Sequence, residues 1–310
     1  MIRIFRGLEG IKKERRGIAL GVFDGVHRGH QALIHALIEA CEKDGLIPAA
    51  LTFSYETGFG FDRKPVGHTL IMSEEDRLKA LGEAGVREIF LVPLTDDFLH
   101  LSPSGFLRLI VENRLGGQLL AIGQDGHFGW HGKGDARFLK TYSSTHPLRS
   151  LVVGDVMWEG DKVSSTRIRG LLAKGEMEQV SALMTRPFRL SGTVISGRRI
   201  GSSIGFPTAN IRYPATAALI RRGVYVTRVR YGGADFPAVT SVGVAPSVHG
   251  GQRELLIESY LYDFDQDLYG REVEVTFLSF VRDERRFDSL EELKAQMTRD
   301  IEGVRARHAV

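Results

Sequence analysis

Short apolar runs alternate with amphipathic segments along the first half of the chain. Residues 18–20 form one such run, and a glycine-rich turn follows it. Apolar side chains then recur at helical spacing, at Leu33, Ile34, Leu37 and Cys41. A run of this length predicts a buried strand, and the spacing after it predicts a helix. The segment is therefore expected to be a strand, a tight turn and a helix.

The same alternation continues toward residue 184. Residues 48–53, 88–92 and 119–123 predict further strands, and residues 73–85 and 102–114 predict helices between them. Strands that alternate with helices favour a mostly parallel sheet, which binds ligands at the carboxyl ends of its strands. The turn at Gly21 and the loop at Asp125 are both expected at that edge.

The pattern changes near residue 185. Short runs rich in β-branched and aromatic residues now follow one another, separated by turn residues, over residues 189–195, 223–231, 236–244, 254–261 and 272–281. This arrangement predicts a small antiparallel barrel. Asp288 is expected to cap a final helix. The sequence thus predicts an α/β domain over residues 1–184 and a barrel domain over residues 185–310.

Composition and charge agree with an ordinary globular protein of two domains. Apolar residues make up 43% of the chain, and 41 basic against 38 acidic residues give a formal charge of +3, which is too small to indicate nucleic-acid binding by itself. Cys41 is the single cysteine, so an intrachain disulfide is excluded. With no apolar run long enough for a membrane span, these features predict a cytoplasmic location.

Two segments of the first domain are predicted to bind anions. Residues 21–31, GVFDGVHRGHQ, place His27 and His30 at the start of a helix, where backbone N–H groups and two imidazoles can donate to a phosphate. Residues 163–169, VSSTRIR, combine hydroxyl caps with Arg167 and Arg169 before another helix. The alternative interpretations are an ordinary glycine turn and an ordinary N-cap.

The second domain carries its own candidate chemistry. Glycines precede the sequence GFPTAN. Thr208 and Asn210 lie two residues apart in it, so in an extended segment they can face the same side and present two neutral oxygens to Mg²⁺. Glu258 lies within an apolar strand, where a carboxylate without a partner is costly to bury. It is expected either to pair with an arginine or to have a catalytic function.

These motifs together resemble a known family. H-x-G-H is similar to the signature of the HxGH nucleotidyltransferases, and FDGVHRGHQ with SSTxIR resembles the adenylyltransferase half of the prokaryotic bifunctional riboflavin kinase/FMN adenylyltransferases, or FAD synthetases. GFPTAN resembles the ATP–Mg²⁺ motif of riboflavin kinase. The resemblance implies a Rossmann-like nucleotidyltransferase domain followed by a β-barrel kinase domain with a C-terminal helix. It implies that ATP phosphorylates riboflavin to FMN, and that a second ATP then gives AMP to FMN, forming FAD and pyrophosphate.

The resemblance also implies roles for individual residues. Glu258 is expected to be the general base of the kinase, with His27 and His30 acting in adenylyl transfer. The expected ATP and phosphate contacts are Gly21, Phe23, Asp24, Gly25, Gly29, Ser164, Ser165, Thr166, Arg167, Arg169, Gly201, Gly205, Phe206, Pro207, Thr208 and Asn210. Asp125, Phe128 and Phe287 are expected to contact flavin, and Thr208 and Asn210 to bind Mg²⁺.

Three positions of the first domain depart from the family pattern. Val22 stands where members usually have asparagine, Tyr55 falls in a segment that usually reads F-x-P-H-P, and Gly126 replaces an aromatic residue. Two alternatives therefore stay open: a riboflavin kinase with a degenerate nucleotide-binding domain, and a flavin carrier that catalyses neither step. Small molecules, with no nucleic acid or membrane, are the expected partners.

Overall fold

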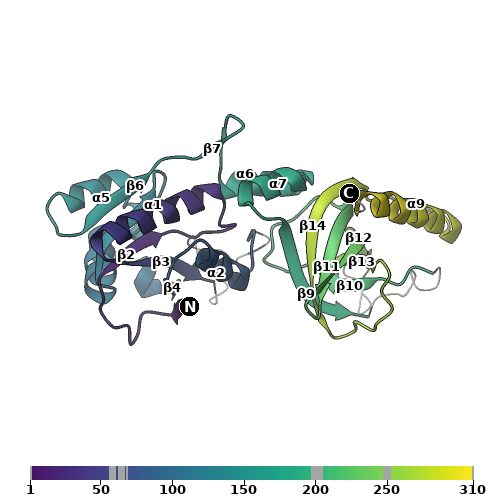
Figure 1. Ribbon diagram of the computed structural model, residues 1–310, viewed down its shortest axis with the longest axis horizontal. Coiled ribbons are helices and arrows are strands. Elements are labelled where there is room, and N and C mark those ends of the chain that lie inside the picture. Colours follow the sequence, from purple (N-terminus) through teal and green to yellow (C-terminus); the bar gives the residue numbers. More distant parts are fainter. Residues whose placement is uncertain are drawn as a thin grey trace. The chain divides into compact units, whose positions relative to one another are not determined.

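The computed structural model describes residues 2–55, 61, 67, 69–196, 205–246 and 253–308. These residues form two compact units. The first comprises residues 1–66 and 73–165, and the second comprises residues 67–72 and 166–310. A layered sheet forms the first unit and a barrel forms the second (Figure 1).

The first unit is built on a six-stranded sheet in the order β1-β4-β3-β2-β5-β6, with every neighbouring pair parallel. Its strands are β1 (Arg3–Arg6), β2 (Arg16–Leu20), β3 (Ile47–Ser54), β4 (Glu88–Pro93), β5 (Gly117–Gly123) and β6 (Arg149–Val153). A small antiparallel hairpin of β7 (Met157–Trp158) and β8 (Asp161–Lys162) follows the sheet. Because β2 and β5 are parallel neighbours, the Gly21 turn and the Asp125 loop follow the same edge, as the sequence predicts.

Helices connect these strands. They are α1 (Arg28–Asp44), α2 (Glu74–Glu83), α3 (Asp96–Leu99), α4 (Pro103–Gly105), η1 (Phe106–Arg114), η2 (Trp130–Gly132) and α5 (Ala136–Ser143). Ser73 caps α2 by accepting the Asp76 N–H. The helix expected over residues 102–114 is a short α-helical turn that continues into the π-helix η1. Ser102 caps that turn, as the serine and the following proline favour.

Alternate residues of β2 pack on opposite faces of the sheet. On one face, a Cβ at Gly17 would lie 2.3 Å from Cys41 Sγ and 3.0 Å from Leu37 Cδ1, so α1 packs directly on the backbone of β2. On the other face, Ile18 and Leu20 belong to a core cluster that includes residues of η1 and α5. Cys41 is thus a buried residue of the core, as its position on the apolar face of α1 predicts.

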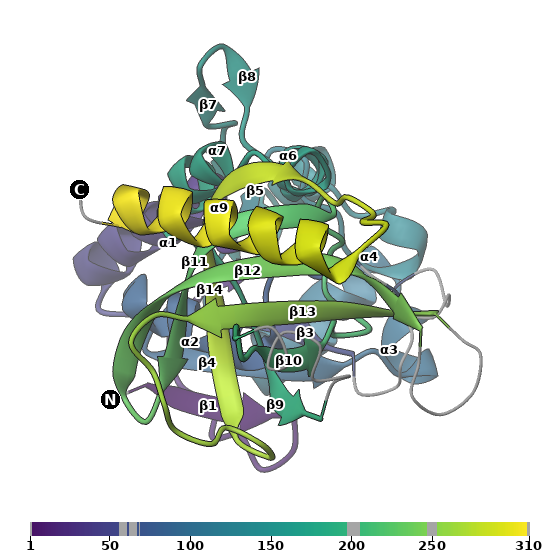
Figure 2. The ribbon, with the colours of Figure 1, turned by 90° about the vertical axis from the view of Figure 1, so that its right-hand side faces the viewer.

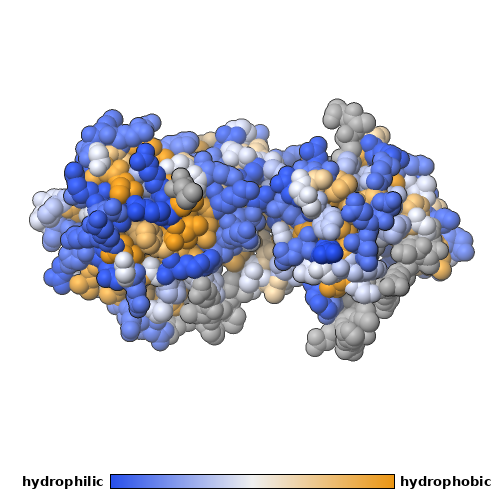
Figure 3. Space-filling model, turned by 60° about the horizontal axis from the view of Figure 1, so that its bottom comes forward, coloured by the Kyte–Doolittle hydropathy of each residue, from blue (hydrophilic) through white to orange (hydrophobic). Residues whose placement is uncertain are grey.

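Apolar side chains also reach the surface of the first unit. In Figure 3 they gather on the side that faces the viewer, with hydrophilic residues around them. Several partly buried apolar residues pack against the core cluster from outside, among them Phe5, Leu8, Val22, Tyr55 and Phe98. The core of this unit is therefore continuous with partly exposed apolar side chains.

The second unit is a closed antiparallel barrel in the order β10-β13-β12-β11-β14-β9. Its strands are β9 (Phe188–Ile195), β10 (Ala209–Arg212), β11 (Gly223–Tyr231), β12 (Ala234–Pro246), β13 (Arg253–Leu261) and β14 (Glu272–Asp283). Helices α6 (Ser165–Lys174) and α7 (Met177–Met184) precede it, and α9 (Leu290–His308) follows it. Since α7 contacts β9 and β14, it packs with the barrel, although it precedes residue 185, where the second domain is expected to begin.

Each barrel strand separates a packed interior from an outer face. On β13, Ile257 and Ser259 are buried inside, and a row of hydroxyl groups runs from Thr227 through Thr240 to Ser259, at 2.6 and 2.8 Å. Glu258 and Tyr260 point to the other side of the strand. Helix α9 lies across that outer face, over β11 and β12 (Figure 2).

The N-terminus of α9 differs from the prediction in one detail. The Glu292 N–H is accepted by Ser289 Oγ at 3.1 Å, so the cap is Ser289 rather than Asp288. Asp288 instead donates its own N–H to the Glu292 carboxylate. Asp288 and Ser289 are both residue types that cap helices, and their propensities do not distinguish neighbouring positions.

Candidate active sites

The turn between β2 and α1 has an unusual backbone. Phe23 and Val26 adopt positive φ angles of 55° and 36°, and Gly25 adopts 86°. A positive φ is rare for a bulky or β-branched residue and persists only when the surroundings hold it in place. The turn therefore has a strained conformation immediately before the helix that carries the two histidines.

His27 and His30 meet at the start of α1. Nδ1 of His27 accepts the His30 N–H at 3.4 Å, and the two rings stack with centroids 3.7 Å apart. His30 Nδ1 is buried and has no hydrogen-bond partner among the residues that the structure describes. Burial, and secondarily the charge of His27, lowers the pKa of His30 well below its ordinary value. A buried ring nitrogen at a helix N-terminus is suited to an anionic ligand, which would favour the protonated ring.

The second predicted anion segment meets this turn. Ser165 Oγ donates to the backbone carbonyl of Asp24 at 2.9 Å, and Asp24 is itself buried. A Cβ at Gly29 would lie 3.2 Å from the His27 ring and 3.7 Å from the carbonyl of Val163, so glycine permits a close approach there. The structure thus brings the FDGVHRGH and SST motifs together within the first unit.

The remaining residues of that segment begin α6, and the second unit includes them. Arg169 Nε donates to the carbonyl of Thr69 at 2.6 Å, and Thr166 is exposed. Arg167 is half-buried. Their predicted contacts with phosphate stay predictions.

The loop after β5 carries the two residues of the first unit expected to contact flavin. Asp125 pairs with Lys162, which also contacts Asp155 at 2.8 Å. Phe128 is buried in the core beside Phe106, with ring centroids 5.7 Å apart. A Cβ at Gly126 would lie 3.0 Å from the carbonyl oxygen of Gly123, so the loop in this conformation favours glycine at that position.

Two aromatic features near this edge were not predicted. The ring of Trp130 stacks on His100 with centroids 4.0 Å apart, and Trp158 of the β7–β8 hairpin lies 4.1 Å from the Arg28 guanidinium carbon. Both tryptophans belong to loops or short elements without periodicity, which is why the hydrophobic pattern does not reveal them.

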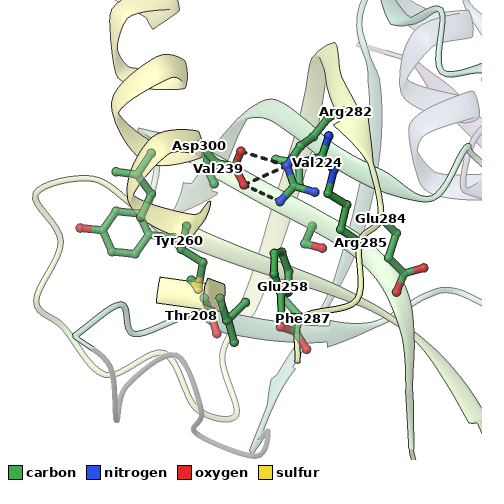
Figure 4. A pocket seen from close by; sticks show the side chains of 14 residues that line it. Thr208, Val224, Val239, Glu258, Tyr260, Arg282, Glu284, Arg285, Phe287 and Asp300 are labelled. Carbon is green, nitrogen blue, oxygen red and sulfur yellow. Dashed lines mark hydrogen bonds and ion pairs between the residues drawn. The ribbon is translucent and has the colours of Figure 1, made fainter. Parts of the chain in front are cut away.

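A second candidate site is the pocket between the outer face of the barrel and α9 (Figure 4). Thr208, Glu258 and Phe287, all predicted from the sequence, line it together. Asn210 lies directly opposite Glu258 in the β10–β13 register, and its Nδ2 donates to the Thr208 carbonyl at 3.1 Å and to Thr208 Oγ1 at 3.3 Å. Gly205 has a φ of 95°, and Gly201 lies outside the described residues.

An ion pair closes this pocket on the side of α9. Arg282 Nη2 lies 2.6 Å from Asp300 Oδ2, and Gln296 Nε2 donates to Asp300 Oδ1 at 2.8 Å. The dashed lines in Figure 4 mark the contact between Arg282 and Asp300. The sequence motifs do not predict Arg282 or Asp300 as site residues, nor the pocket-lining Tyr260 and Arg285. Asp300 and Gln296 lie one turn apart on the buried side of α9. Two polar residues at that spacing on an otherwise apolar helix face are the sequence feature that could have indicated a buried polar contact here.

Comparison with known proteins gives both halves a family. Residues 11–167 match the FAD synthetase model, and residues 184–308 match the riboflavin kinase model. Over 307 residues, the chain is 33% identical to the bifunctional riboflavin kinase/FMN adenylyltransferase of Pseudomonas fluorescens, covering 98% of this chain and 97% of that protein. The chain belongs to the bifunctional riboflavin kinase/FMN adenylyltransferase family. The relative from Listeria monocytogenes is 34% identical, over 93% of this chain and 91% of its own length.

The family membership confirms the main predictions from the sequence. The Rossmann-like nucleotidyltransferase domain, the barrel with its C-terminal helix and the two flavin-forming activities are those of a bifunctional riboflavin kinase/FMN adenylyltransferase. A solved structure described as a macrolide-efflux protein from Streptococcus pneumoniae also shares the fold, with a TM-score of 0.84 and 29% identity over 98% of this chain and 99% of that chain. In the described part of the present chain, no helix is long and apolar enough to span a bilayer.

Proposed function

We propose that the pocket between β13 and α9 is the riboflavin kinase site and that Glu258 is its general base. Glu258 would take the proton from the ribityl 5′-hydroxyl as that oxygen attacks the γ-phosphate of ATP. The observation that carries this assignment is the common pocket of Glu258, Thr208 and Phe287, residues from three separate segments. Phe287 would contact the flavin, and Gly205, Phe206 and Pro207, with the undescribed Gly201, would contact ATP.

The oxygens near Glu258 suit Mg²⁺. Thr208, which lines the pocket with Glu258, offers a hydroxyl, and Asn210, which pairs with Glu258 in the strand register, offers an amide oxygen; an oxygen-only set of this kind is what Mg²⁺ prefers. We infer that Thr208 and Asn210 hold this ion, which when bound would neutralise phosphate charge. The chain's own contribution is to fix the two side chains by the Asn210–Thr208 hydrogen bonds. Chelation by EDTA is expected to stop FMN formation, and added Mg²⁺ to restore it.

The first unit is proposed as the adenylyltransferase site. Its support is the buried His30 Nδ1, which lies beside His27 at the start of α1 and has no hydrogen-bond partner within the described part of the chain. Donation from both imidazoles to the ATP α-phosphate would stabilise the charge that develops when FMN attacks it. The residues that the sequence motifs offer as ATP contacts are Gly21, Phe23, Asp24, Gly25, Gly29, Ser164, Ser165, Thr166, Arg167 and Arg169, and Asp125 and Phe128 are the expected flavin contacts.

The decisive experiment follows flavins over time in two reactions with ATP and Mg²⁺, one started from riboflavin and one from FMN. We expect FAD in both. FMN that accumulates without FAD, together with no product from FMN, would support the riboflavin kinase alternative. Bound flavin with no consumption of ATP would support the carrier. The cytoplasmic location and the restriction to small-molecule partners stay predictions.

A further inference from the structure

A buried arginine of α2 contacts the backbone on which the first site is built. Arg77 is 4% exposed, and its guanidinium donates three hydrogen bonds to described residues. Nη1 donates to the carbonyl of Val22 at 2.7 Å and to Thr52 Oγ1 at 3.2 Å, and Nη2 donates to the carbonyl of Phe53 at 2.6 Å. Thr52 Oγ1 itself donates to the Val22 carbonyl at 3.0 Å. These contacts form one network that joins α2, β3 and the turn after β2.

The network begins where the strand pairing ends. β2 and β3 are in register as far as Leu20 and Leu51, and the Gly21 N–H still donates to the Leu51 carbonyl at 3.2 Å. Beyond this point, Arg77 and Thr52 connect Val22 to β3. The carboxyl ends of two adjacent strands, where this type of sheet binds its ligands, are thereby held together by a side chain from a third element.

Val22 is also the residue from which the strained turn departs. Phe23, Gly25 and Val26 follow it with positive φ angles, and a conformation of this kind needs support from its surroundings. Arg77 holds the turn at the Val22 carbonyl, and Ser165 holds it at the Asp24 carbonyl. The two contacts together fix the backbone that leads to His27.

We propose that Arg77 is a positioning residue for adenylyl transfer, because its guanidinium fixes the turn that carries His27 and His30 relative to β3. This inference rests on the proposed function of the first unit. It also gives a reason why valine is tolerated at position 22: the contact is made to the backbone carbonyl, and the Val22 side chain packs against the core. Burial lowers the pKa of the Arg77 guanidinium, and the charges of Tyr55, Asp24 and Glu74 act in the opposite direction.

A purely structural role is the alternative, and the chain offers a matched control for it. Arg16 is also completely buried, and it bonds Glu88 and the Leu115 carbonyl, each at 2.5 Å. It lies at the start of β2, at the opposite end of the strand from the histidine turn. Replacing either arginine by lysine keeps the positive charge but removes the planar guanidinium, which can donate hydrogen bonds to several acceptors at once.

The test measures both reactions of full-length Arg77→Lys and Arg16→Lys, together with the thermal stability of each variant. For Arg77→Lys we expect kcat of FAD formation from FMN to fall by at least about tenfold, while riboflavin phosphorylation by the same molecules is unchanged. Arg16→Lys should lose comparable stability but keep the wild-type FAD rate well below its melting temperature. Histidine NMR signals of His27 and His30 should move in Arg77→Lys only.

Thr52→Val provides a second variant in case Arg77→Lys folds poorly. It removes the hydroxyl that bridges Arg77 and Val22, and it should lower the same kcat by a smaller factor without changing the kinase rate. The proposal is overturned if Arg77→Lys and Thr52→Val lose stability yet form FAD at the wild-type rate, or if Arg16→Lys impairs FAD formation equally. A wild-type protein that forms no FAD from FMN would instead reject the proposed function of the first unit.

Discussion

The rings of His27 and His30 stack face to face at the N-terminus of α1, with centroids 3.7 Å apart. Burial, and secondarily the charge of His27, lowers the pKa of His30 well below its ordinary value, so the neutral form of His30 is favoured in the folded protein. A nucleotide phosphate beside the rings would raise that pKa, so binding of a non-hydrolysable ATP analogue should take up a proton. Calorimetry in buffers of different ionisation enthalpy measures this proton uptake. The uptake should disappear in His30→Gln and persist in His35→Gln, because His35 is an exposed residue of the same helix. Equal uptake in both variants would contradict the assignment.

The same lowered pKa predicts how stability depends on pH. Below the ordinary histidine pKa of 6.5, the unfolded chain binds a proton that folded His30 resists, so folding stability falls as the pH drops through and below that value. Above it, the contribution of His30 is constant. Urea denaturation between pH 5 and pH 8, compared for the wild type and His30→Gln, should show a shallower decline in the variant.

Glu258→Gln is expected to lower the rate of FMN formation by about 10²- to 10⁴-fold, since an amide cannot act as the general base. ATP binding and FAD formation from FMN should remain. Glu254→Gln is the matched control, because Glu254 lies on the same strand and side but makes an exposed ion pair with Arg212 at 3.3 Å. A Glu258→Gln protein with the kinase rate of the Glu254→Gln protein would remove Glu258 from its proposed role.

Asp300→Asn should destabilise the barrel half and weaken riboflavin binding. The substitution leaves the largely buried guanidinium of Arg282 without its carboxylate, which costs about 3 kcal/mol. Asp263→Asn removes a second ion pair that α9 makes, to Arg305, where both side chains are mostly exposed, and the substitution should cost less than about 1 kcal/mol. Denaturant unfolding and riboflavin titration of the two variants distinguish these outcomes, and equal losses would argue against α9 as a wall of the pocket.

The extent of the second folding unit can be tested with fragments. Met177, Val180, Leu183 and Met184 are buried on α7, and each such side chain contributes roughly 1.5–3 kcal/mol when it is fully buried. A fragment of residues 166–310 should therefore be more stable than a fragment of residues 185–310 toward urea. Equal stability would support residue 185 as the start of an independent domain.

Local patterns predicted those parts of the molecule whose structure depends on neighbours in sequence. The turn at Gly21, the cap at Ser73 and strand β11 follow from periodicity and capping residues, and the structure has them at the expected positions. Strand β10 was not predicted, because its four residues are too few to show a period of two. Its pairing with β13 supplies the missing information, and it places Asn210 opposite Glu258.

The contacts that complete the sites join residues distant in sequence. Arg77 meets Val22 across 55 positions, and Arg282 meets Asp300 across 18. Neither arginine differs from a surface residue in its local pattern, because only the tertiary fold decides which cationic side chains are buried. The sequence motifs therefore indicated the groups with proposed chemical roles, whereas the residues that hold them in place required the structure.

Strand β13 has its two sides in different environments, with Ile257 and Ser259 in the barrel interior and Glu258 and Tyr260 in the pocket. The packing that determines whether the barrel folds and the surface that lines the pocket are therefore encoded at alternate positions of one segment. Libraries restricted to the outward positions of β11, β12 and β13 can vary flavin-analogue selectivity while the interior stays constant. The pocket can therefore be redesigned by changing outward side chains alone, without altering the residues that form the barrel core.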